Sequence, residues 1–306
     1  MPKLYVDRSI KIDAPVADVF SKLNDFNHWQ PWSPWLIQEP EAKVTVAEDT
    51  KSYSWEGNRI GSGQMKIENE EENKSIHYDL QFLKPWKSKA KTWFEFAEDG
   101  DGTKVTWYMD SSLPWFMFWM KNQMNAFIGM DYERGLSMLK DYVEKGSVPS
   151  FVDLKGVQSF GPAQFVAKST STTIEEMGSA MEKDLGELMG WAEENGGYNG
   201  YPITVYHKWD MVNRRVDYTT GVPVDELPGE LKPGFTTLNI PEIQTYTVTH
   251  EGEYKHLGNA WSTGMNLSQN KVFKGSKSQH PFELYVSDPK ETKPEELVTE
   301  IRFPIK

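Results

Sequence analysis

The second half of the chain contains an internal repeat, and this repeat constrains the possible folds more than any other feature of the sequence. Residues 201–206 (YPITVY) have a counterpart in residues 280–285 (HPFELY). Each copy is preceded by a strand pattern, at residues 164–169 and 244–250, that leads into a helix. The repeat predicts two strand–helix–strand–strand units that pair as pseudo-twofold halves with a cleft between them.

The first half of the chain is predicted to form an antiparallel sheet followed by a long helix. Strand patterns recur over residues 53–110, and apolar side chains alternate with polar ones over residues 76–82. Such alternation is typical of an antiparallel sheet with one face in solvent. Residues 99–102 (DGDG) are a hairpin signal, and a helical apolar pattern covers residues 125–145. Together, the two halves predict an α+β fold.

A boundary between domains is expected where glycine and proline interrupt the helical pattern, at residues 146–150 (GSVPS). A length of 306 residues is enough for two ordinary domains. We therefore expect a first domain at residues 1–146, a linker at residues 147–156 and a second domain at residues 157–306.

The composition excludes several classes of function. Lys and Arg number 33 and Asp and Glu number 45, so the formal net charge is −12. This charge repels phosphate backbones, and no nucleic-acid partner is expected. The chain has no cysteine, which rules out disulfides, thiolate nucleophiles and cysteine-based metal sites. The six histidines show no metal-ligand spacing, so neither a metal nor a cofactor is expected.

The sequence also sets expectations about location. Residues 1–12 alternate like a strand and lack the continuous apolar region of a secretory signal. The longest aromatic-rich apolar stretch, residues 113–120, is eight residues long, whereas a helix needs about 20 residues to span a bilayer. We therefore expect a cytoplasmic chain without a membrane partner, and the sequence indicates no particular protein partner.

Glu283 is the candidate for chemistry in the second half. Because side chains alternate across a strand, Glu283 shares a face with Tyr285, and the matching face of the other copy carries Thr204 and Tyr206. If the copies pack symmetrically, a lone carboxylate lies in a cleft walled by tyrosines. It could bind a cationic, aromatic ligand, or it could activate a water as a general base. The alternative is that Glu283 points to solvent on a half-exposed strand.

Residues 281–289 (PFELYVSDP) resemble the aromatic–Glu–aliphatic–Tyr strand, ending in Asp-Pro, of the GyrI-like domain, the effector-binding module of AraC- and MerR-type multidrug regulators. The resemblance covers roughly residues 157–306 and includes the duplicated layout. It implies that Glu283 faces the ligand cleft and pairs with cationic lipophilic compounds. Some stand-alone members of the family hydrolyse reactive electrophilic toxins with the matching glutamate. The candidate aromatic walls of this site are Tyr206, Tyr254, Trp261 and Tyr285.

The first half resembles the SRPBCC or polyketide-cyclase/START-like helix-grip domain. The resemblance rests on residues 12–15 (IDAP), 25–35 (DFNHWQPWSPW) and 53–63, and it covers about residues 3–146. It implies a sheet curled around a long C-terminal helix, with hydrophobic ligands held in the space between them. The family shares no single catalytic motif, so the resemblance implies a fold more than an activity.

Tryptophan is concentrated in the first half of the chain. Nine of the 12 tryptophans lie there, namely Trp29, Trp32, Trp35, Trp55, Trp86, Trp93, Trp107, Trp115 and Trp119. A cavity lined by several of them would suit a flat lipophilic guest, and Trp55, Trp93 and Trp107 are the candidates. The alternative is a tryptophan-rich core.

Residues 112–130 are too apolar for an ordinary solvent-exposed loop. Exposed apolar patches of this kind usually have partners, so we interpret the segment as a lid, an interdomain contact or a membrane-surface helix. Lys121 is the only cation close to it in the sequence, which favours a lid or an interface.

These observations predict a two-domain binder of lipophilic small molecules, cationic ones included. It would sense, sequester or detoxify its ligand without a DNA-binding domain of its own. The alternative is an enzyme: a hydrolase of reactive lipophilic compounds with Glu283 as general base, or a protein with cyclase-like activity.

Overall fold

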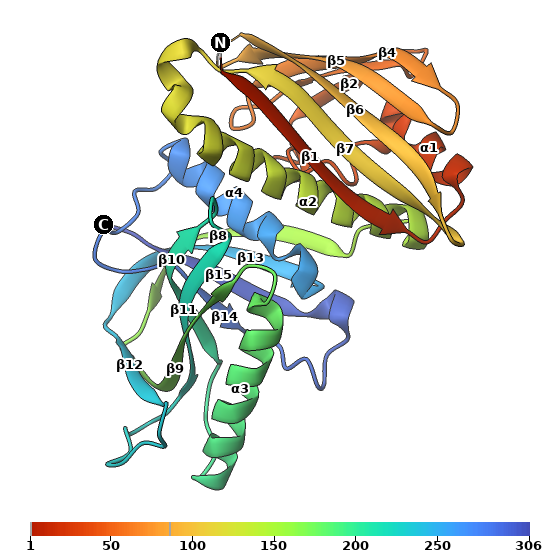
Figure 1. Ribbon diagram of the computed structural model, residues 1–306. Helices are drawn as coiled ribbons and strands as arrows, with labels where there is room; N and C mark the ends of the chain where they lie inside the picture. The colour runs from red at the N-terminus through yellow and green to blue at the C-terminus, as the bar shows by residue number, and fades with distance from the viewer. Residues whose placement is uncertain (1, 86) are drawn as a thin grey trace. The chain divides into compact units, whose positions relative to one another are not determined.

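The computed structural model describes residues 2–85 and 87–306, so that Trp86 lies outside the described residues. The chain divides into two compact units, the first ending at Pro149 and the second covering Ser150–Lys306. Each unit is built on one antiparallel sheet (Figure 1). The predicted α+β class is therefore confirmed.

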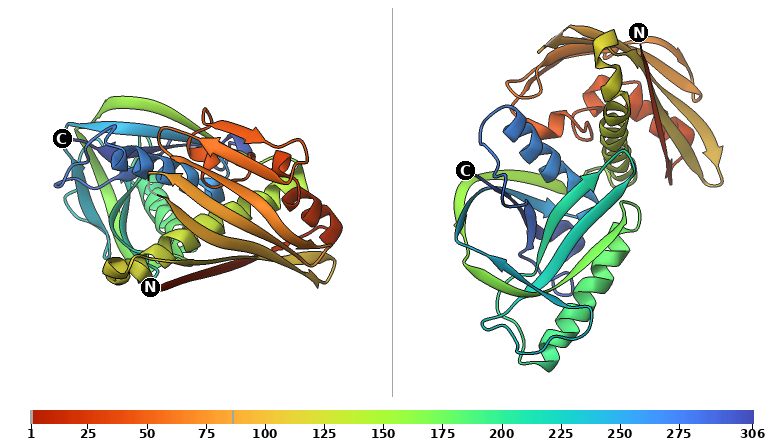
Figure 2. Two further views of the ribbon diagram at one scale, coloured as in Figure 1. Left: turned by 90° about the horizontal axis from the view of Figure 1, so that it is seen from above. Right: turned by 60° about the vertical axis from the view of Figure 1, so that its left-hand side comes forward.

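The first unit is a seven-stranded sheet with one long helix. Its strands are β1 (Lys3–Ile12), β2 (Lys43–Val46), β3 (Ser52–Glu56), β4 (Ser62–Glu71), β5 (Ser75–Lys84), β6 (Ser88–Asp99) and β7 (Gly102–Ser112), in the order β1-β7-β6-β5-β4-β3-β2. Its helices are α1 (Val16–Leu23), η1 (Phe26–His28), η2 (Leu36–Gln38), η3 (Trp115–Met120) and α2 (Lys121–Lys145). Figure 2 shows α2 lying along the sheet, as expected for a helix-grip fold.

The face of the sheet toward α2 is an aromatic core. Trp107 of β7 stacks on Phe94 of β6 and on Tyr132 of α2, with ring centroids 4.8 and 3.8 Å apart. The indole N–H of Trp107 donates to the hydroxyl of Thr92 at 2.8 Å, which satisfies its only polar group. Burying large aromatic side chains contributes about 1.5–3 kcal/mol each. Trp107 is therefore held as a core residue.

Trp55 of β3 is buried in the same core, and its ring is the reason why residue 63, in the 53–63 pattern, is a glycine. Its ring lies so close to Gly63 of β4 that a Cβ there would come within 2.3 Å of the indole. Residue 63 must therefore be glycine for Trp55 to pack flat on the neighbouring strand.

Trp93, the third candidate for a cavity in this unit, lies on the opposite face of the sheet. It pairs in register with Tyr108, and its ring stacks on Tyr108 and His77. Phe94, the next residue of β6, is the one that pairs with Trp107. Because successive side chains point to opposite faces, Trp93 and Trp107 cannot line one cavity, and that part of the prediction is wrong.

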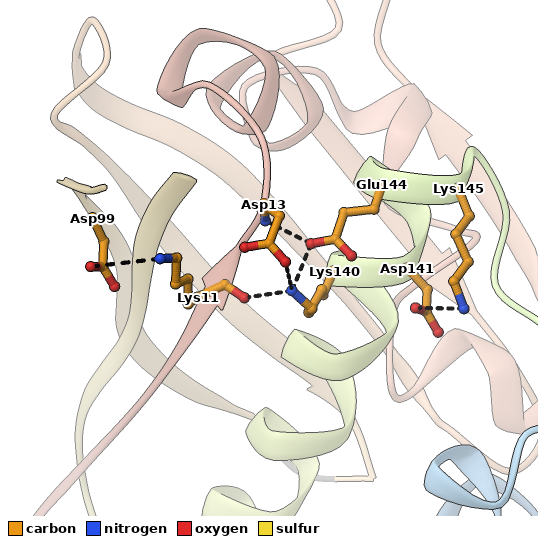
Figure 3. Close-up of polar contacts among 7 residues, drawn as sticks. All are labelled: Lys11, Asp13, Asp99, Lys140, Asp141, Glu144 and Lys145. Carbon is orange, nitrogen blue, oxygen red and sulfur yellow. Dashed lines mark hydrogen bonds and ion pairs between the residues drawn. The ribbon is translucent and has the colours of Figure 1, made fainter. Parts of the chain in front are cut away.

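A polar cluster ties the C-terminal part of α2 to the end of β1 (Figure 3). The Lys140 ammonium donates to the carbonyl oxygen of Lys11 at 3.0 Å, to Asp13 at 3.0 Å and to Glu144 at 2.6 Å. Burial alone would lower the pKa of Lys140, but the carboxylates of Glu144 and Asp13 raise it above its usual value. The cluster fixes the C-terminal end of α2 against β1. The N-terminal end of the same helix follows η3.

The second unit is an eight-stranded sheet with two longer helices. Its strands are β8 (Ser150–Phe160), β9 (Ala163–Thr173), β10 (Ile203–Asp210), β11 (Arg215–Pro223), β12 (Thr236–Ile240), β13 (Ile243–Gly252), β14 (Phe282–Tyr285) and β15 (Val298–Pro304). Its helices are α3 (Met177–Glu194), η4 (Tyr254–His256), α4 (Gly258–Gln269) and η5 (Pro294–Glu296).

The strand order of this sheet, β12-β9-β11-β10-β14-β15-β13-β8, is symmetric about the central pair β10 and β14. One half contributes β9, α3, β10 and β11, and the other contributes β13, α4, β14 and β15, so the predicted duplication is confirmed. The strand that precedes each copy crosses to the other one: β8 pairs with β13, and β12 pairs with β9. This exchange joins the two halves into one sheet.

Residues 150–156, predicted as part of a linker, form the first part of β8. They pair with β13 from Ser150 opposite Gly252 onward. The backbone hydrogen bonds of these residues thus go to a strand whose paired residues lie 91 to 102 positions away in the sequence, and local turn signals do not reveal such a partner.

Glu39, at the end of η2, holds the turn between β3 and β4. Its carboxylate accepts the backbone N–H groups of Asn58, Arg59 and Ile60 at 2.8, 2.9 and 2.9 Å, and the residue is only 2% exposed. Burial alone would raise the pKa of Glu39, but these N–H groups and the Arg59 charge lower it below its usual value.

We predict that Glu39→Gln lowers the free energy of unfolding by about 1–3 kcal/mol at pH 7, because an amide cannot accept three N–H groups as a carboxylate does. The folded pKa of Glu39 lies below its unfolded pKa. Its contribution is therefore present above the unfolded value and is lost as the pH falls through the folded one. Urea unfolding at pH 7 and at successively lower pH should show the loss shrinking.

The matched control is Glu48→Gln, on an exposed loop residue, which should change the free energy of unfolding by less than about 0.5 kcal/mol. Equal effects of the two substitutions at pH 7 would contradict the role given to Glu39.

Candidate functional site

Glu283 lies at the centre of the second unit, where the two halves of the repeat meet. In the register of β10 and β14, Glu283 pairs with Thr204, Phe282 with Val205 and Leu284 with Ile203. Thr204 and Glu283 also occupy the same position in the two copies, so the pseudo-twofold axis passes between them. The one carboxylate of this motif therefore sits on the symmetry axis.

The Glu283 carboxylate is buried and hydrogen-bonded by aromatic side chains. Trp261 of α4 donates its indole N–H to Oε1 at 2.6 Å, and Tyr285 donates its hydroxyl to Oε2 at 2.8 Å. Tyr206 of β10 is a further hydrogen-bonding neighbour. Glu283 is only 3% exposed, so the alternative in which it points to solvent is wrong.

Electrostatically, Glu283 is a buried carboxyl group without a cationic partner among the described residues. Burial raises the pKa of the carboxyl, and the hydrogen bonds from Trp261, Tyr285 and Tyr206 only partly offset this rise. Burial and the charge of Glu283 in turn raise the pKa of Tyr206 and of Tyr285, so both phenols keep their protons. When ionised, the Glu283 carboxylate thus places a negative charge between neutral aromatic donors.

Aromatic rings surround this carboxylate. Tyr206 meets the edge of Trp261 at a centroid distance of 5.1 Å and stacks on Trp209 at 5.3 Å. Tyr254 meets Tyr285 edge-on at 6.0 Å and is 39% exposed. The exposed Tyr254 marks the side on which the site approaches solvent.

The structure thus brings together all five residues that the sequence proposed for this unit: Tyr206, Tyr254, Trp261, Glu283 and Tyr285. Their role in ligand binding stays a prediction. In the first unit, Trp55 and Trp107 lie in the core and Trp93 lies on the other face of the sheet, so those three residues do not form one site.

Sequence reasoning missed Met181 and Trp209. Met181 of α3 lies 80 residues before Trp261, close to the spacing of the repeat, and its sulfur lies 3.9 Å from the hydroxyl oxygens of Tyr206 and of Tyr285. The repeat spacing could have revealed it. Trp209 reaches the face of Tyr206 only because a β-bulge inserts His207 between the two residues, and alternation cannot anticipate a bulge.

Gly264 positions α4 against the sheet. A Cβ at this residue would come within 2.1 Å of the ring of Phe303 on β15. Trp261, one turn earlier on the helix, also contacts Phe303, with ring centroids 5.4 Å apart. This close approach sets the depth at which the indole of Trp261 reaches Glu283.

A metal site or a membrane-spanning helix would each have a recognisable form within residues 2–85 and 87–306. In this part of the chain, no group of three or more His, Asp or Glu side chains is arranged to hold a metal ion. No helix in the same part is long and apolar enough to cross a membrane.

Comparison with known families assigns each half of the chain. Residues 3–144 match the family model described as polyketide cyclase / dehydrase and lipid transport. Residues 158–306 match the model of the GyrI-like small molecule binding domain. Both resemblances seen in the sequence are thereby confirmed. The sequence matches no curated protein.

Several solved structures are similar to parts of the chain. A structure of an EcmrR–DNA complex is 19% identical, covers 61% of this chain and 68% of its own, and has a TM-score of 0.43. The C-terminal domain of EcmrR is 21% identical over 51% of this chain and 98% of its own, with a TM-score of 0.40. A Mesorhizobium loti protein is 12% identical over 47% and 99%, with a TM-score of 0.36. These similarities are too weak to support any functional argument.

We predict that Glu283→Gln stabilises the chain at neutral pH and that the gain disappears in acid. Because the folded pKa of Glu283 is raised, the wild type is most stable below the unfolded pKa, near 4.5, and loses stability as the pH rises through the folded value. The amide carries no charge at any pH. Urea unfolding at pH 4, 6 and 8 should therefore show a growing advantage of Glu283→Gln over the wild type.

The control is Glu251→Gln, an exposed position on β13, which should track the wild type at every pH. A gain for Glu283→Gln that is constant with pH, or is largest in acid, would refute the assignment of a buried charge.

Proposed function

We propose that this chain, a fusion of a polyketide-cyclase-type domain with a GyrI-like small-molecule-binding domain, binds a lipophilic cation at Glu283 and thereby senses, sequesters or detoxifies it. Binding of small molecules is the function that the family of the second domain carries in its description. The cationic, lipophilic nature of the ligand is the part that we propose.

The observation that carries the proposal is that the buried carboxyl group of Glu283 has no counter-charge among the described residues. Removing a carboxylate from water costs several kcal/mol unless a counter-charge or strong hydrogen bonds replace the hydration. Trp261, Tyr285 and Tyr206 supply neutral donors, and no cation of the described residues contributes to its pKa. A cationic ligand would add the missing counter-charge.

The hydrogen-bond capacity of the carboxylate supports the same proposal. An ionised carboxylate offers about four lone-pair sites, and three donors approach Glu283. About one acceptor site is therefore left for a ligand N–H or a water. A quaternary cation would interact with the whole carboxylate and with the faces of the surrounding rings instead.

The side chain of Met181 occupies the space next to the hydroxyls of Tyr206 and Tyr285. Its thioether lies against the hydroxyls of Tyr206 and Tyr285, and the residue is 9% exposed. A Met side chain is flexible and makes only weak hydrogen bonds through sulfur, so moving it breaks no strong hydrogen bond. We propose that a ligand enters past Tyr254 and takes the place of Met181 beside Glu283.

One observation favours a second candidate function, hydrolysis. A general base works best when its pKa lies near the working pH, and burial shifts the pKa of Glu283 in that direction. The remaining acceptor site on the carboxylate could hold the attacking water. Binding alone explains the same geometry, so turnover must be measured directly.

We predict that Glu283→Gln weakens binding of tetraphenylphosphonium by about tenfold to a hundredfold and leaves binding of the neutral analogue triphenylphosphine oxide unchanged. Loss of the negative charge removes the attraction that only the cation feels. Isothermal titration calorimetry on the full chain measures both affinities, and Glu251→Gln serves as the matched control on the exposed part of β13.

Trp261→Phe provides a second variant, because it keeps a ring against Phe303 and removes one donor to Glu283. It should retain the preference for the cation. If the wild type bound both probes equally, and Glu283→Gln changed neither affinity, the proposal of a cation site would fail.

The hydrolase candidate predicts turnover of a lipophilic ester such as p-nitrophenyl butyrate. Because general-base catalysis contributes about 10²–10⁴-fold, Glu283→Gln should lower kcat/KM by at least about a hundredfold. A wild-type rate equal to that of Glu283→Gln would exclude a catalytic role for this carboxylate and leave the binding proposal intact.

A further inference from the structure

The connection between β7 and α2 presents aromatic side chains to solvent. Within η3, four rings are exposed by more than half: Trp115 by 75%, Phe116 by 59%, Phe118 by 65% and Trp119 by 68%. Leu113 just before them is buried, and Met117 between them packs against the core of the first unit. The segment is thus anchored from inside, and the anchoring turns the rings outward.

The sheet brings lysines to the same end of the unit. Lys3 of β1 pairs with Ser112, the last residue of β7. The hydroxyl of Ser111 donates to the carbonyl oxygen of Lys89 on β6 at 3.1 Å. Lys3 and Lys89 therefore lie on the strands flanking β7, where that strand passes into η3, and the exposed Lys121 follows directly after η3. Figure 1 shows the start of β1 at this end of the sheet.

Lysines outnumber acids at this end, where the exposed Asp110 of β7 lies just before the segments concerned. Residues 2–4, 82–91 and 111–127 contain six lysines and no Asp or Glu, although acids outnumber bases by 45 to 33 in the whole chain. Lys84 and Lys91 pair with glutamates on other strands, Glu56 and Glu68. The four other lysines of these segments are exposed: Lys3, Lys87, Lys89 and Lys121.

We propose that this aromatic end, defined as η3 with the surrounding lysines, docks on the surface of an anionic lipid bilayer. Trp and Phe side chains favour the headgroup and acyl boundary, and nearby lysines are attracted to anionic headgroups. Peripheral attachment needs both kinds of contribution, because either one alone binds weakly. The aromatic end offers both.

The charge of the rest of the chain would orient the protein on an anionic membrane. With a formal net charge of −12, most of the surface is repelled by an anionic membrane, whereas the aromatic end is attracted. η3 is six residues long and cannot span a bilayer, so the rings enter only the interface. The occupant that fits this chemistry is therefore a membrane surface.

The test is co-sedimentation of the full chain with vesicles of phosphatidylcholine alone and with vesicles of equal parts phosphatidylcholine and phosphatidylglycerol. We expect binding to the anionic vesicles only, weakening as salt is added. The double variant Trp115→Ser/Trp119→Ser should lower the partition coefficient by about tenfold, and Lys3→Glu/Lys89→Glu by about tenfold or more.

Two control variants carry similar changes elsewhere. Val272→Ser removes an exposed apolar side chain from the second unit, and Lys104→Glu reverses an exposed charge at the other end of β7. Both should bind as the wild type does. Far-ultraviolet circular dichroism of each variant separates lost binding from lost folding.

Three outcomes would overturn the proposal. One is the absence of binding to either kind of vesicle. Another is binding that is equal for neutral and anionic vesicles, because the lysines then have no role. The third is a dimer of the wild type that Trp115→Ser/Trp119→Ser dissociates in the absence of lipid, because a second copy of the chain would then cover the rings.

Discussion

A carboxylate taken out of water must recover its hydration from neighbouring donors, and Glu283 recovers it from one indole N–H and two phenol hydroxyls. Several features of the second unit position these donors and the rings around them. The repeat places β14 beside β10, the contact of Gly264 with Phe303 sets the depth of Trp261, and a bulge brings Trp209 behind Tyr206. When Glu283 is ionised, its negative charge is solvated by the protein but not neutralised by any cation among the described residues.

The sequence could predict this site to the extent that local rules determine it. Strand alternation placed Glu283 and Tyr285 on one face, and the repeat added Tyr206 from the other copy. Met181 followed the same repeat spacing and could have been found. Trp209 could not, because a single inserted residue reverses the face of everything after it.

The error at Trp93 has a different cause. Alternation shows which side chains of one strand share a face of the sheet. Whether side chains of two strands, such as Trp93 and Trp107, share a face depends on the register in which the strands pair. The hairpin between β6 and β7 pairs Asp99 with Gly102, so an odd residue on one strand always lies opposite an even residue on the other. Trp93 is thus opposite Tyr108. The charge of the aromatic end could not be predicted from the sequence for the same reason. In the linear sequence only Lys121 is close to η3, whereas strand pairing adds Lys3 and Lys89.

The position of the pseudo-twofold axis has an evolutionary consequence. When a gene segment duplicates, both copies begin with the same residue at each position. Two glutamates at positions 204 and 283 would put like charges directly opposite each other on adjacent strands, in a buried place where their repulsion is weakly screened. Only one copy can keep an ionised carboxylate there. The threonine at position 204, whose hydroxyl lies 3.1 Å from that of Tyr285, is the complement that lets the other copy keep its charge. An ionised carboxylate at one of these two positions is therefore compatible only with an uncharged residue at the other.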